Sequence, residues 1–307
     1  MAVRLLVLAG PTASGKTRLG VRAAHALGTE IVSADSRQVY RGLDVGSGKD
    51  LEEYRAVSPP VPCRLIDVAD PAAIYSVFHY QRDCYRLLAE WEGGRGAGGT
   101  PLLMVGGTGL FVEAVLKGYR ISDVPEDEEL RTRLMARPAS DLIRELRSLD
   151  EDLHRRTDTS SKKRVVRAVE IARHAQDHDV AVSPPPPVRI EHAVFALDVP
   201  REELHRRIDA RLDSRLAGGM IEEVRGLLDR GLPPARMAQL GLEYREVTAF
   251  LTGAKSRSEM EEDLRLGIRH LAKRQLTWFR GFPRRGIEVR WIGPEDVDAV
   301  LGYDWKS

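Results

Sequence analysis

The residues best suited to chemistry lie near the amino end, in the segment GPTASGKT at residues 10–17. This segment fits the G-x-x-x-x-G-K-[ST] pattern of a phosphate-binding loop, whose glycines let the backbone fold around an anion. Its N–H groups and the dipole of the next helix face phosphate oxygens, the lysine reaches the terminal phosphate, and the hydroxyl of Thr17 can bind Mg²⁺. The candidate phosphate-binding residues are Gly10, Pro11, Thr12, Ala13, Ser14, Gly15, Lys16 and Thr17.

The surroundings of this loop support its assignment but do not identify the ligand. An apolar run at residues 5–8 precedes the loop and a helical pattern follows it, as the motif requires. Alone, the loop would indicate a small-molecule kinase or NTPase, and these usually carry a further Asp after an apolar strand. The run LLMVGG at residues 102–107 takes that position without an acid. A hydrolytic NTPase is therefore disfavoured, and it stays open as an alternative.

Two polar residues follow other apolar runs and are candidates for catalysis. Asp35 comes just after residues 31–33, at the edge where open α/β sheets bind their ligands. Asp-Ser is also good turn and capping chemistry, which is the structural alternative for Asp35. Thr108 lies in GGTG, where the glycines allow a ligand to approach the backbone, but threonine is also an ordinary turn residue.

The elements that must position these residues follow an α/β pattern. Apolar runs at residues 5–8, 31–33, 65–68, 102–105, 194–199 and 289–292 alternate with helix-like stretches, which predicts a parallel sheet. Residues 120–187 are highly charged, helix-like and end in SPPPPV, so we expect a helical insertion into a core of residues 1–119 and 188–307. A long helix is predicted over 257–280, with Ser258 and Glu261 as its capping box.

Composition limits the function classes further. The chain of 307 residues has a net charge of +1, so a nucleic-acid partner would have to meet a local basic patch. Two such patches occur: residues 155–173 hold seven Lys or Arg against two acids, and residues 269–285 hold six and no acid. No apolar run is long enough to span a membrane. The two cysteines, Cys63 and Cys84, fit no metal spacing, which favours a reducing cytoplasm.

Four motifs together resemble one known family. The run DSRQVYRGLDVGSGK at residues 35–49 is similar to the D-S-x-Q-V-Y-x-G-L-D-[IV]-G-[TS]-x-K pattern of tRNA dimethylallyltransferases. Residues 105–118, 162–171 and 272–280 (AKRQLTWFR) resemble that family's further motifs, in the same order. The resemblance implies a P-loop NTPase-like parallel sheet core with a helical insertion domain, and a monomer. Adenylate isopentenyltransferases, which act on free nucleotides, share the first loop and remain an alternative.

This resemblance implies transfer of a dimethylallyl group from dimethylallyl diphosphate to the N6 amine of the adenosine 3′-adjacent to the tRNA anticodon, with release of diphosphate. Asp35 would be the general base, Thr108 would hydrogen-bond the adenine or the base, and Lys16 with Mg²⁺ on Thr17 would stabilise the leaving diphosphate. Arg211 would also contact that diphosphate. The resemblance assigns the tRNA anticodon stem-loop to Asp35, Ser36, Arg37, Gln38, Thr108, Arg131, Lys163, Arg164, Arg167 and residues 241–246, with Lys273 and Arg274 for either substrate.

The chain departs from the family pattern at a few positions. Cys63 and Arg64 in CRLIDV replace a usual His-His pair. Arg215 stands where a methionine is expected, and Glu243 in GLEYRE precedes Tyr244 where the family usually has Gly-Tyr. A carboxylate at Glu243 would repel an RNA phosphate, so the departures bear on substrate binding rather than on the reaction class.

Overall fold

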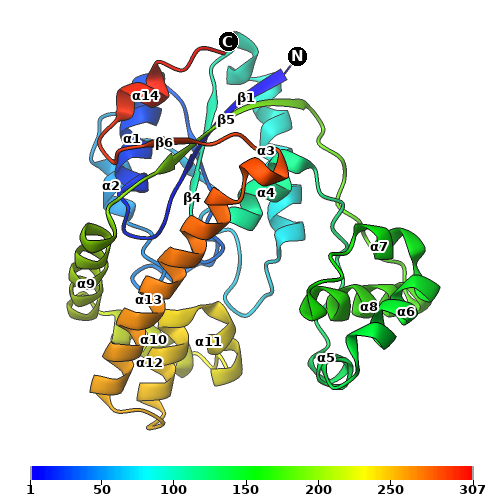
Figure 1. Cartoon of the computed structure of the whole chain (residues 1–307). Coiled ribbons are helices and arrows are strands. Elements are labelled where there is room, and N and C mark those ends of the chain that lie inside the picture. The colour runs from blue at the N-terminus through cyan, green and yellow to red at the C-terminus, as the bar shows by residue number, and fades with distance from the viewer. Residues whose placement is uncertain (1, 306–307) are drawn as a thin grey trace. The chain divides into compact units, whose positions relative to one another are not determined.

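The structure is a computed structural model that describes residues 2–305, with the backbone alone at Ala97. It divides into two compact units, coloured along the chain in Figure 1. The first unit comprises Met1–Gly118 and Pro186–Ser307, and the second comprises Tyr119–Pro185. Within residues 2–305, no helix is long and apolar enough to cross a membrane.

The first unit is built on a six-stranded sheet in which every pair of neighbours is parallel. Its spatial order is β3-β2-β4-β1-β5-β6, with β1 near the centre. The strands are β1 (Ala2–Ala9), β2 (Ile31–Ser33), β3 (Cys63–Arg64), β4 (Leu102–Gly106), β5 (Arg189–Leu197) and β6 (Arg290–Ile292). The predicted parallel α/β core is confirmed.

Helices cover both faces of this sheet, which explains why its strands read as continuous apolar runs. Along β1, Leu5 and Val7 point into one core while Leu6 and Leu8 point into the other, because side chains alternate along a strand. The first core includes α3 (Val77–Gly93), α4 (Gly109–Lys117), α9 (Arg201–Ala217), α10 (Met220–Asp229), α11 (Pro234–Leu240), α12 (Leu242–Leu251) and α13 (Arg257–Arg280). The second includes α1 (Lys16–Leu27), α2 (Leu51–Arg55) and α14 (Val297–Leu301).

The parallel arrangement brings the chemically interesting segments to one edge. In parallel strands all carboxyl ends lie on the same side, where open α/β sheets bind their ligands. Residues 10–17 follow β1, Asp35 follows β2, and Thr108 follows β4. Helix α9 begins just after β5. Four segments far apart in the sequence therefore meet at this carboxyl edge.

Two details of the sequence-based expectation are wrong. Residues 65–68 are not a strand: β3 is the pair Cys63–Arg64, and both Leu65 and Asp67 have φ of +57°, which breaks the extended backbone. Helix α13 has the expected bounds, but its capping box is formed by Ser256 and Glu259. The expected cap, Ser258, is already inside the helix, and a cap must lie just outside it.

The second unit is a small helical bundle with its own apolar core. It contains α5 (Glu128–Met135), α6 (Ala139–Leu149), α7 (Glu151–Arg156) and α8 (Lys162–Asp177). Leu142 and Leu146 of α6 pack with Val165 and Val169 of α8, all fully buried. Apolar residues at helical spacing therefore form a separate core in this unit, although the segment is highly charged.

A buried carboxylate ties this bundle together. Glu170 of α8 is only 2% exposed and accepts hydrogen bonds from the Asp127 amide (2.7 Å) and from Arg131 Nη2 (2.9 Å). Arg167 also pairs with Glu170, and its other Nη donates to the Val124 carbonyl at 2.6 Å. Burial opposes ionisation of Glu170, but these donors outweigh it and hold its pKa below the usual value.

Replacing Glu170 with alanine is expected to destabilise the second unit by about 3–5 kcal/mol, because two arginines would lose a buried partner. Glu126→Ala is the matched control: its carboxylate also pairs with Arg131, at 2.6 Å, but is 58% exposed, so we expect at most about 1 kcal/mol. Hydrogen exchange of the α8 amides in the full chain measures both effects. Equal exchange in the Glu170 variant and the unaltered protein would show that the cluster does not stabilise the bundle.

Candidate active site

The phosphate-binding loop joins β1 to α1 at the carboxyl edge of the sheet. Gly15 caps α1 with φ of +92°, a left-handed conformation that suits glycine. Ala13 also has a positive φ, +61°. Turns of this kind aim successive N–H groups at one point and form an anion-binding nest. The buried Ser14 hydroxyl has no hydrogen-bond partner within residues 2–305, and Thr17 is half-buried in the first helical turn.

Lys16 is placed to meet an anion, and its pKa is lower than that of an ordinary lysine. Its Nζ lies 3.3 Å from the Pro11 carbonyl oxygen, across the loop. Burial lowers the pKa of Lys16 to about 8; the nearby Asp35 carboxylate opposes this change, and the Arg211 guanidinium adds to it. An anion bound in the loop would favour the charged lysine and raise this pKa again.

The affinity for inorganic diphosphate should therefore fall as the pH rises through about 8, where the free protein loses the Lys16 ammonium. If only the charged form binds, each further pH unit weakens binding about tenfold. Calorimetric titration across this range measures the effect. Lys16→Arg is the control, because a guanidinium keeps its proton throughout and should show no break near pH 8. If the affinity of both proteins falls at the same pH, a group other than Lys16 causes the pH dependence.

Asp35 and Thr108 lie on neighbouring loops that the strands hold together. The Thr108 amide donates to the Ala34 carbonyl at 3.1 Å, and the Thr108 hydroxyl accepts from the Ser36 amide at 2.9 Å. Gly106 makes this approach possible, since a β-carbon there would lie 2.1 Å from the Ala34 oxygen. One Asp35 carboxylate oxygen accepts from the Arg37 amide at 2.9 Å, which fixes its orientation.

Two arginines of α9 contact the phosphate-binding loop. Arg207 donates to the Ser14 carbonyl at 3.3 Å. Arg211 lies 3.4 Å from the Thr12 hydroxyl, donates to the Gly48 carbonyl at 3.2 Å, and pairs with Asp50. The structure thus places Arg211 beside the loop, where its role in binding diphosphate stays a prediction, and it also places there Arg207, which sequence reasoning missed.

Gln275 is a second residue that sequence reasoning missed. It lies on α13 within AKRQLTWFR, and its Oε1 accepts from the Thr12 amide at 2.8 Å. Its Nε2 donates to the Gly107 carbonyl at 3.0 Å. One amide side chain therefore joins the phosphate-binding loop to the Thr108 loop. The uncharged Gln in a run of cations was the available signal.

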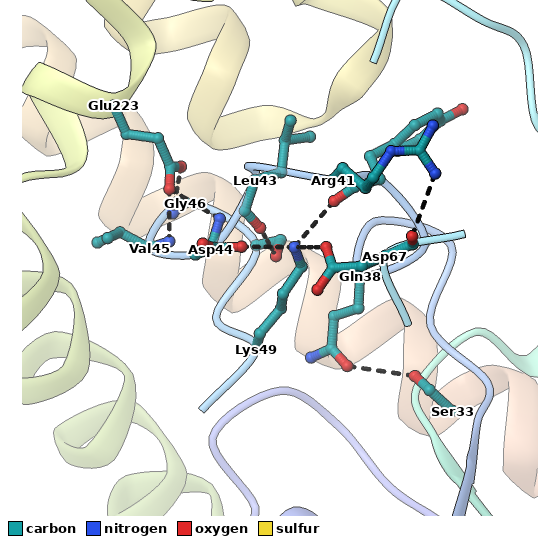
Figure 2. A network of polar contacts seen from close by, with 12 residues as sticks. Ser33, Gln38, Arg41, Leu43, Asp44, Val45, Gly46, Lys49, Asp67 and Glu223 are labelled. Carbon is teal, nitrogen blue, oxygen red and sulfur yellow. Dashed lines mark hydrogen bonds and ion pairs between the residues drawn. The ribbon is translucent and has the colours of Figure 1, made fainter. Parts of the chain in front are cut away.

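A polar network shapes the loop that follows Asp35 (Figure 2). Lys49 is 1% exposed and donates to the Tyr40 carbonyl at 2.9 Å, to Asp44 at 2.5 Å, and to Asp67. The Glu223 carboxylate accepts from three successive backbone amides, at residues 44–46, over 2.7–2.9 Å. Gln38 joins the two halves of the loop by donating to the Gly48 carbonyl at 2.9 Å. These hydrogen bonds hold the shape of the loop that carries Asp35.

The site offers few protein ligands for a metal. Within residues 2–305, no group of three or more His, Cys, Asp or Glu side chains could hold a metal ion. Thr17 supplies a hydroxyl oxygen of the hard kind that Mg²⁺ prefers, and Mg²⁺ commonly completes its shell with substrate phosphates and water. The residues present therefore fit Mg²⁺ that arrives with a phosphate ligand.

Comparison with known proteins identifies the family. The IPP transferase family model matches residues 38–282, and the isopentenyl transferase model matches residues 1–56. The chain belongs to the IPP transferase family. It is a prenyltransferase of the tRNA dimethylallyltransferase type. A tRNA dimethylallyltransferase 1 of Syntrophus aciditrophicus is 46% identical over 300 residues, covering 98% of this chain and 97% of the relative. One from Porphyromonas gingivalis is 43% identical, with 98% and 95% covered.

Solved structures of tRNA-modifying relatives share the fold of this transferase. The tRNA isopentenylpyrophosphate transferase of Bacillus halodurans is 31% identical, with a TM-score of 0.68 and coverage of 97% of this chain and 96% of that one. A eukaryotic dimethylallyltransferase acting on tRNA is 18% identical, with a TM-score of 0.72 over 97% of this chain and 75% of that one. At that identity the likeness concerns the fold alone.

Two departures of this transferase from the family pattern meet each other in the site. Arg215 of α9 and Glu243 of α12 form an ion pair of 3.7 Å, with side chains 12% and 14% exposed. Glu243 therefore has a cation beside it, which offsets the repulsion expected between this carboxylate and an RNA phosphate. Arg64 is not at the site: it pairs with Glu30 at 2.7 Å at the other end of β2, and Cys63 precedes it in β3.

The candidate tRNA residues of the second unit differ in how free their charges are. Arg131 and Arg167 both bond the buried Glu170, so these two charges stabilise the bundle. Lys163 and Arg164 are exposed, and Arg164 pairs with Asp158 at 2.5 Å. Of the expected set, Lys163 and Arg164 are the cations most accessible to a phosphate.

The basic run over residues 269–285, which begins on α13, is also partly compensated by acids from other elements. Arg269 pairs with Asp209 at 2.6 Å, and Arg285 pairs with the buried Glu113 at 2.9 Å. Lys273 and Arg274 are exposed on the first unit. Arg37 donates to the Gln239 carbonyl at 2.7 Å, so it helps to join the Asp35 loop to the end of α11.

Proposed function

We propose that this enzyme transfers a dimethylallyl group from dimethylallyl diphosphate to the N6 amine of the adenosine 3′-adjacent to the anticodon of tRNA. The observation that carries the proposal is the joint placement of a phosphate-binding loop, Asp35 and Thr108 at one sheet edge. Relatives named tRNA dimethylallyltransferase, similar over nearly the whole chain, support the choice of substrates. The match of the isopentenyl transferase model to residues 1–56 is why a free nucleotide is the second candidate acceptor.

Asp35 acts as the general base in this proposal. The adenine amine is a weak nucleophile because its lone pair is delocalised into the ring. As its nitrogen bonds the allylic carbon, the carbon–oxygen bond to diphosphate breaks and that electron pair leaves with the diphosphate. The amine proton passes to one carboxylate oxygen of Asp35. The other oxygen, Oδ1, accepts a hydrogen bond from the Arg37 amide, which keeps the side chain oriented. A general base in such a position typically increases the reaction rate by about 10²–10⁴-fold.

The phosphate-binding loop stabilises the leaving group. Negative charge grows on the diphosphate as the bond breaks, and the loop amides, Lys16 and Arg211 are aimed at the place where it accumulates. Mg²⁺, held by the Thr17 hydroxyl and the phosphate oxygens, would supply further positive charge there. Gln275 joins this loop to the Thr108 loop, so that the prenyl donor and the adenine acceptor are held next to each other.

The second unit binds the RNA in this proposal. Sequence-specific recognition of RNA usually acts on unstacked bases of single-stranded loops, and a modifying enzyme takes its target base out of the stack. Exposed Lys163 and Arg164 of α8 and exposed Lys273 and Arg274 of α13 supply phosphate contacts. Thr108 then orients the flipped adenine against Asp35.

The affinity for tRNA should fall steeply with added salt, because binding releases counterions from the neutralised phosphates. The double variant Lys163→Gln/Arg164→Gln should bind more weakly and lower the slope of log affinity against log salt by about one per lost phosphate contact. Filter binding over a salt series measures the slope. Arg55→Gln, at an exposed arginine 67% accessible on α2, should leave it unchanged. Equal slopes in all three proteins would remove α8 from the RNA surface.

One labelling experiment tests the proposed function. The protein is incubated with Mg²⁺, dimethylallyl diphosphate carrying label in the prenyl group, and either bulk tRNA or AMP. We expect label in tRNA, on the N6 of one adenosine beside the anticodon. Label in AMP alone would support the free-nucleotide acceptor. No prenylation of either, with ADP formed from ATP, would support a kinase or NTPase instead.

A further inference from the structure

Helix α9 presents three arginines at four-residue intervals to the candidate active site. Residues spaced in this way lie on one face of a helix. Arg207 and Arg211 contact the Ser14 carbonyl and the Thr12 hydroxyl, so this face runs along the phosphate-binding loop. Arg215 is the third of the series, one turn beyond Arg211.

Arg215 packs against the same glycine as Arg211. A β-carbon at Gly48 would lie 1.5 Å from Arg215 Nη2 and 2.8 Å from Arg211 Nη2. Gly48 also has φ of +62°, which a side chain would disfavour. The bare glycine thus lets two guanidinium groups stand side by side. The Arg215 charge is felt at the loop, because it is one of the causes that lower the pKa of Lys16.

The partner of Arg215 holds it only loosely. Glu243 lies 3.7 Å from Arg215 Nη1, beyond hydrogen-bonding distance, although both side chains are largely buried. Burial lowers the pKa of Arg215 and raises that of Glu243, so neither charge is well stabilised by the other. Glu243 also lies in the first turn of α12, where the helix dipole favours a negative charge without any arginine.

Three cations, Lys16, Arg211 and Arg215, therefore converge where a polyanion is expected. Within the protein, Asp50 pairs with Arg211 and Glu243 lies near Arg215. Like charges brought together in a partly buried site still favour a further anion. Guanidinium groups bind phosphate oxygens through two parallel hydrogen bonds, which a carboxylate 3.7 Å away does not satisfy.

We propose that Arg215 is a further donor-binding residue, held beside Gly48 by Glu243 in the free protein and turned to the donor's diphosphate when that group binds. The inference rests on the proposed function for the identity of the anion. A purely structural ion pair joining α9 to α12 is the competing account.

Titration of the full chain with inorganic diphosphate separates the two accounts. Arg215→Met should weaken diphosphate binding about tenfold to a hundredfold, the loss expected for one charge-assisted contact. Glu243→Gln should bind diphosphate as tightly as the unaltered protein or more tightly, because it removes a competing carboxylate. Arg215→Lys should recover part of the loss. In turnover, Arg215→Met should raise KM for the prenyl donor and leave KM for tRNA unchanged.

The double variant Arg215→Met/Glu243→Gln keeps the test valid if the single arginine variant unfolds, because it leaves no buried unpaired charge. It should fold and bind diphosphate as weakly as Arg215→Met. Unchanged diphosphate binding in either arginine variant would overturn the inference, and so would equal weakening by Glu243→Gln. If the unaltered protein binds no diphosphate, the proposed function itself fails. If it binds diphosphate but prenylates AMP and no tRNA, only the choice of acceptor fails; if it prenylates neither, the proposed transfer fails while the diphosphate site stands.

Discussion

Asp35→Asn is expected to lower kcat for prenyl transfer by about 10²–10⁴-fold, because an amide cannot accept the proton of the adenine amine. Asparagine keeps an Oδ1 that can accept the Arg37 amide, so the turn that orients the side chain should survive. Removing the carboxylate also removes an attraction that sustains the Lys16 charge, and binding of diphosphate should fall only slightly. Single-turnover prenylation of tRNA with saturating donor measures the loss directly.

Asp70→Asn is the matched control for that experiment. Asp70 makes the same kind of turn, accepting the Ala72 amide at 2.8 Å, but its side chain is exposed. It should turn over like the unaltered enzyme. If Asp35→Asn also retained near wild-type turnover, another group or water would be the base, and Asp35 would serve only to shape its loop.

Lys16→Met is expected to lower kcat/KM for the donor by about 10²–10³-fold or more, since it removes a positioned cation from the leaving diphosphate. The methionine fills similar space without charge. Arg18→Met, on the exposed face of the same helical turn, should leave kcat/KM unchanged. Steady-state kinetics with varied donor and saturating tRNA compare the three proteins. A loss confined to KM for tRNA would contradict the assignment of Lys16 to the donor.

Much of the fold was predictable because its signals are local. Parallel strands buried on both faces leave continuous apolar runs, and a phosphate-binding loop leaves a fixed spacing of glycines, lysine and threonine. The false strand at 65–68 shows the limit. Its apolar residues are real, but Asp67 turns out of the strand and bonds Lys49, eighteen positions away in sequence. Periodicity carries no information about such a partner.

The residues proposed to contact the substrates were predictable from the sequence, but the residues that hold their loops together were not. Asp35, Thr108 and residues 10–17 each follow the carboxyl end of a parallel strand, so the topology of the sheet brings them together. Gln275 joins two loops across more than 160 residues of sequence; its lack of charge sets it apart in a basic run, but nothing local indicates which loops it bonds. The pair Arg215–Glu243 read as two separate irregularities until the fold placed them 3.7 Å apart.

Charge counting along the sequence overestimated the basic surfaces for the same reason. The run over residues 269–285 contains no acid, yet Asp209 and Glu113 from other elements neutralise two of its arginines. In the second unit, Glu170 does the same for Arg131 and Arg167. Net local charge in a folded protein depends on which elements pack together. The RNA surface therefore has to be sought among exposed cations such as Lys163, Arg164, Lys273 and Arg274.

In the proposed reaction, the phosphate-binding loop holds a leaving group and transfers no phosphate. The most direct measurement is the stoichiometry of products when the enzyme acts on tRNA, dimethylallyl diphosphate, Mg²⁺ and ATP together. We expect one diphosphate released for each N6-prenylated adenosine, no release without tRNA, and intact ATP. Consumption of ATP to ADP, or orthophosphate formed in step with prenylation, would contradict this account.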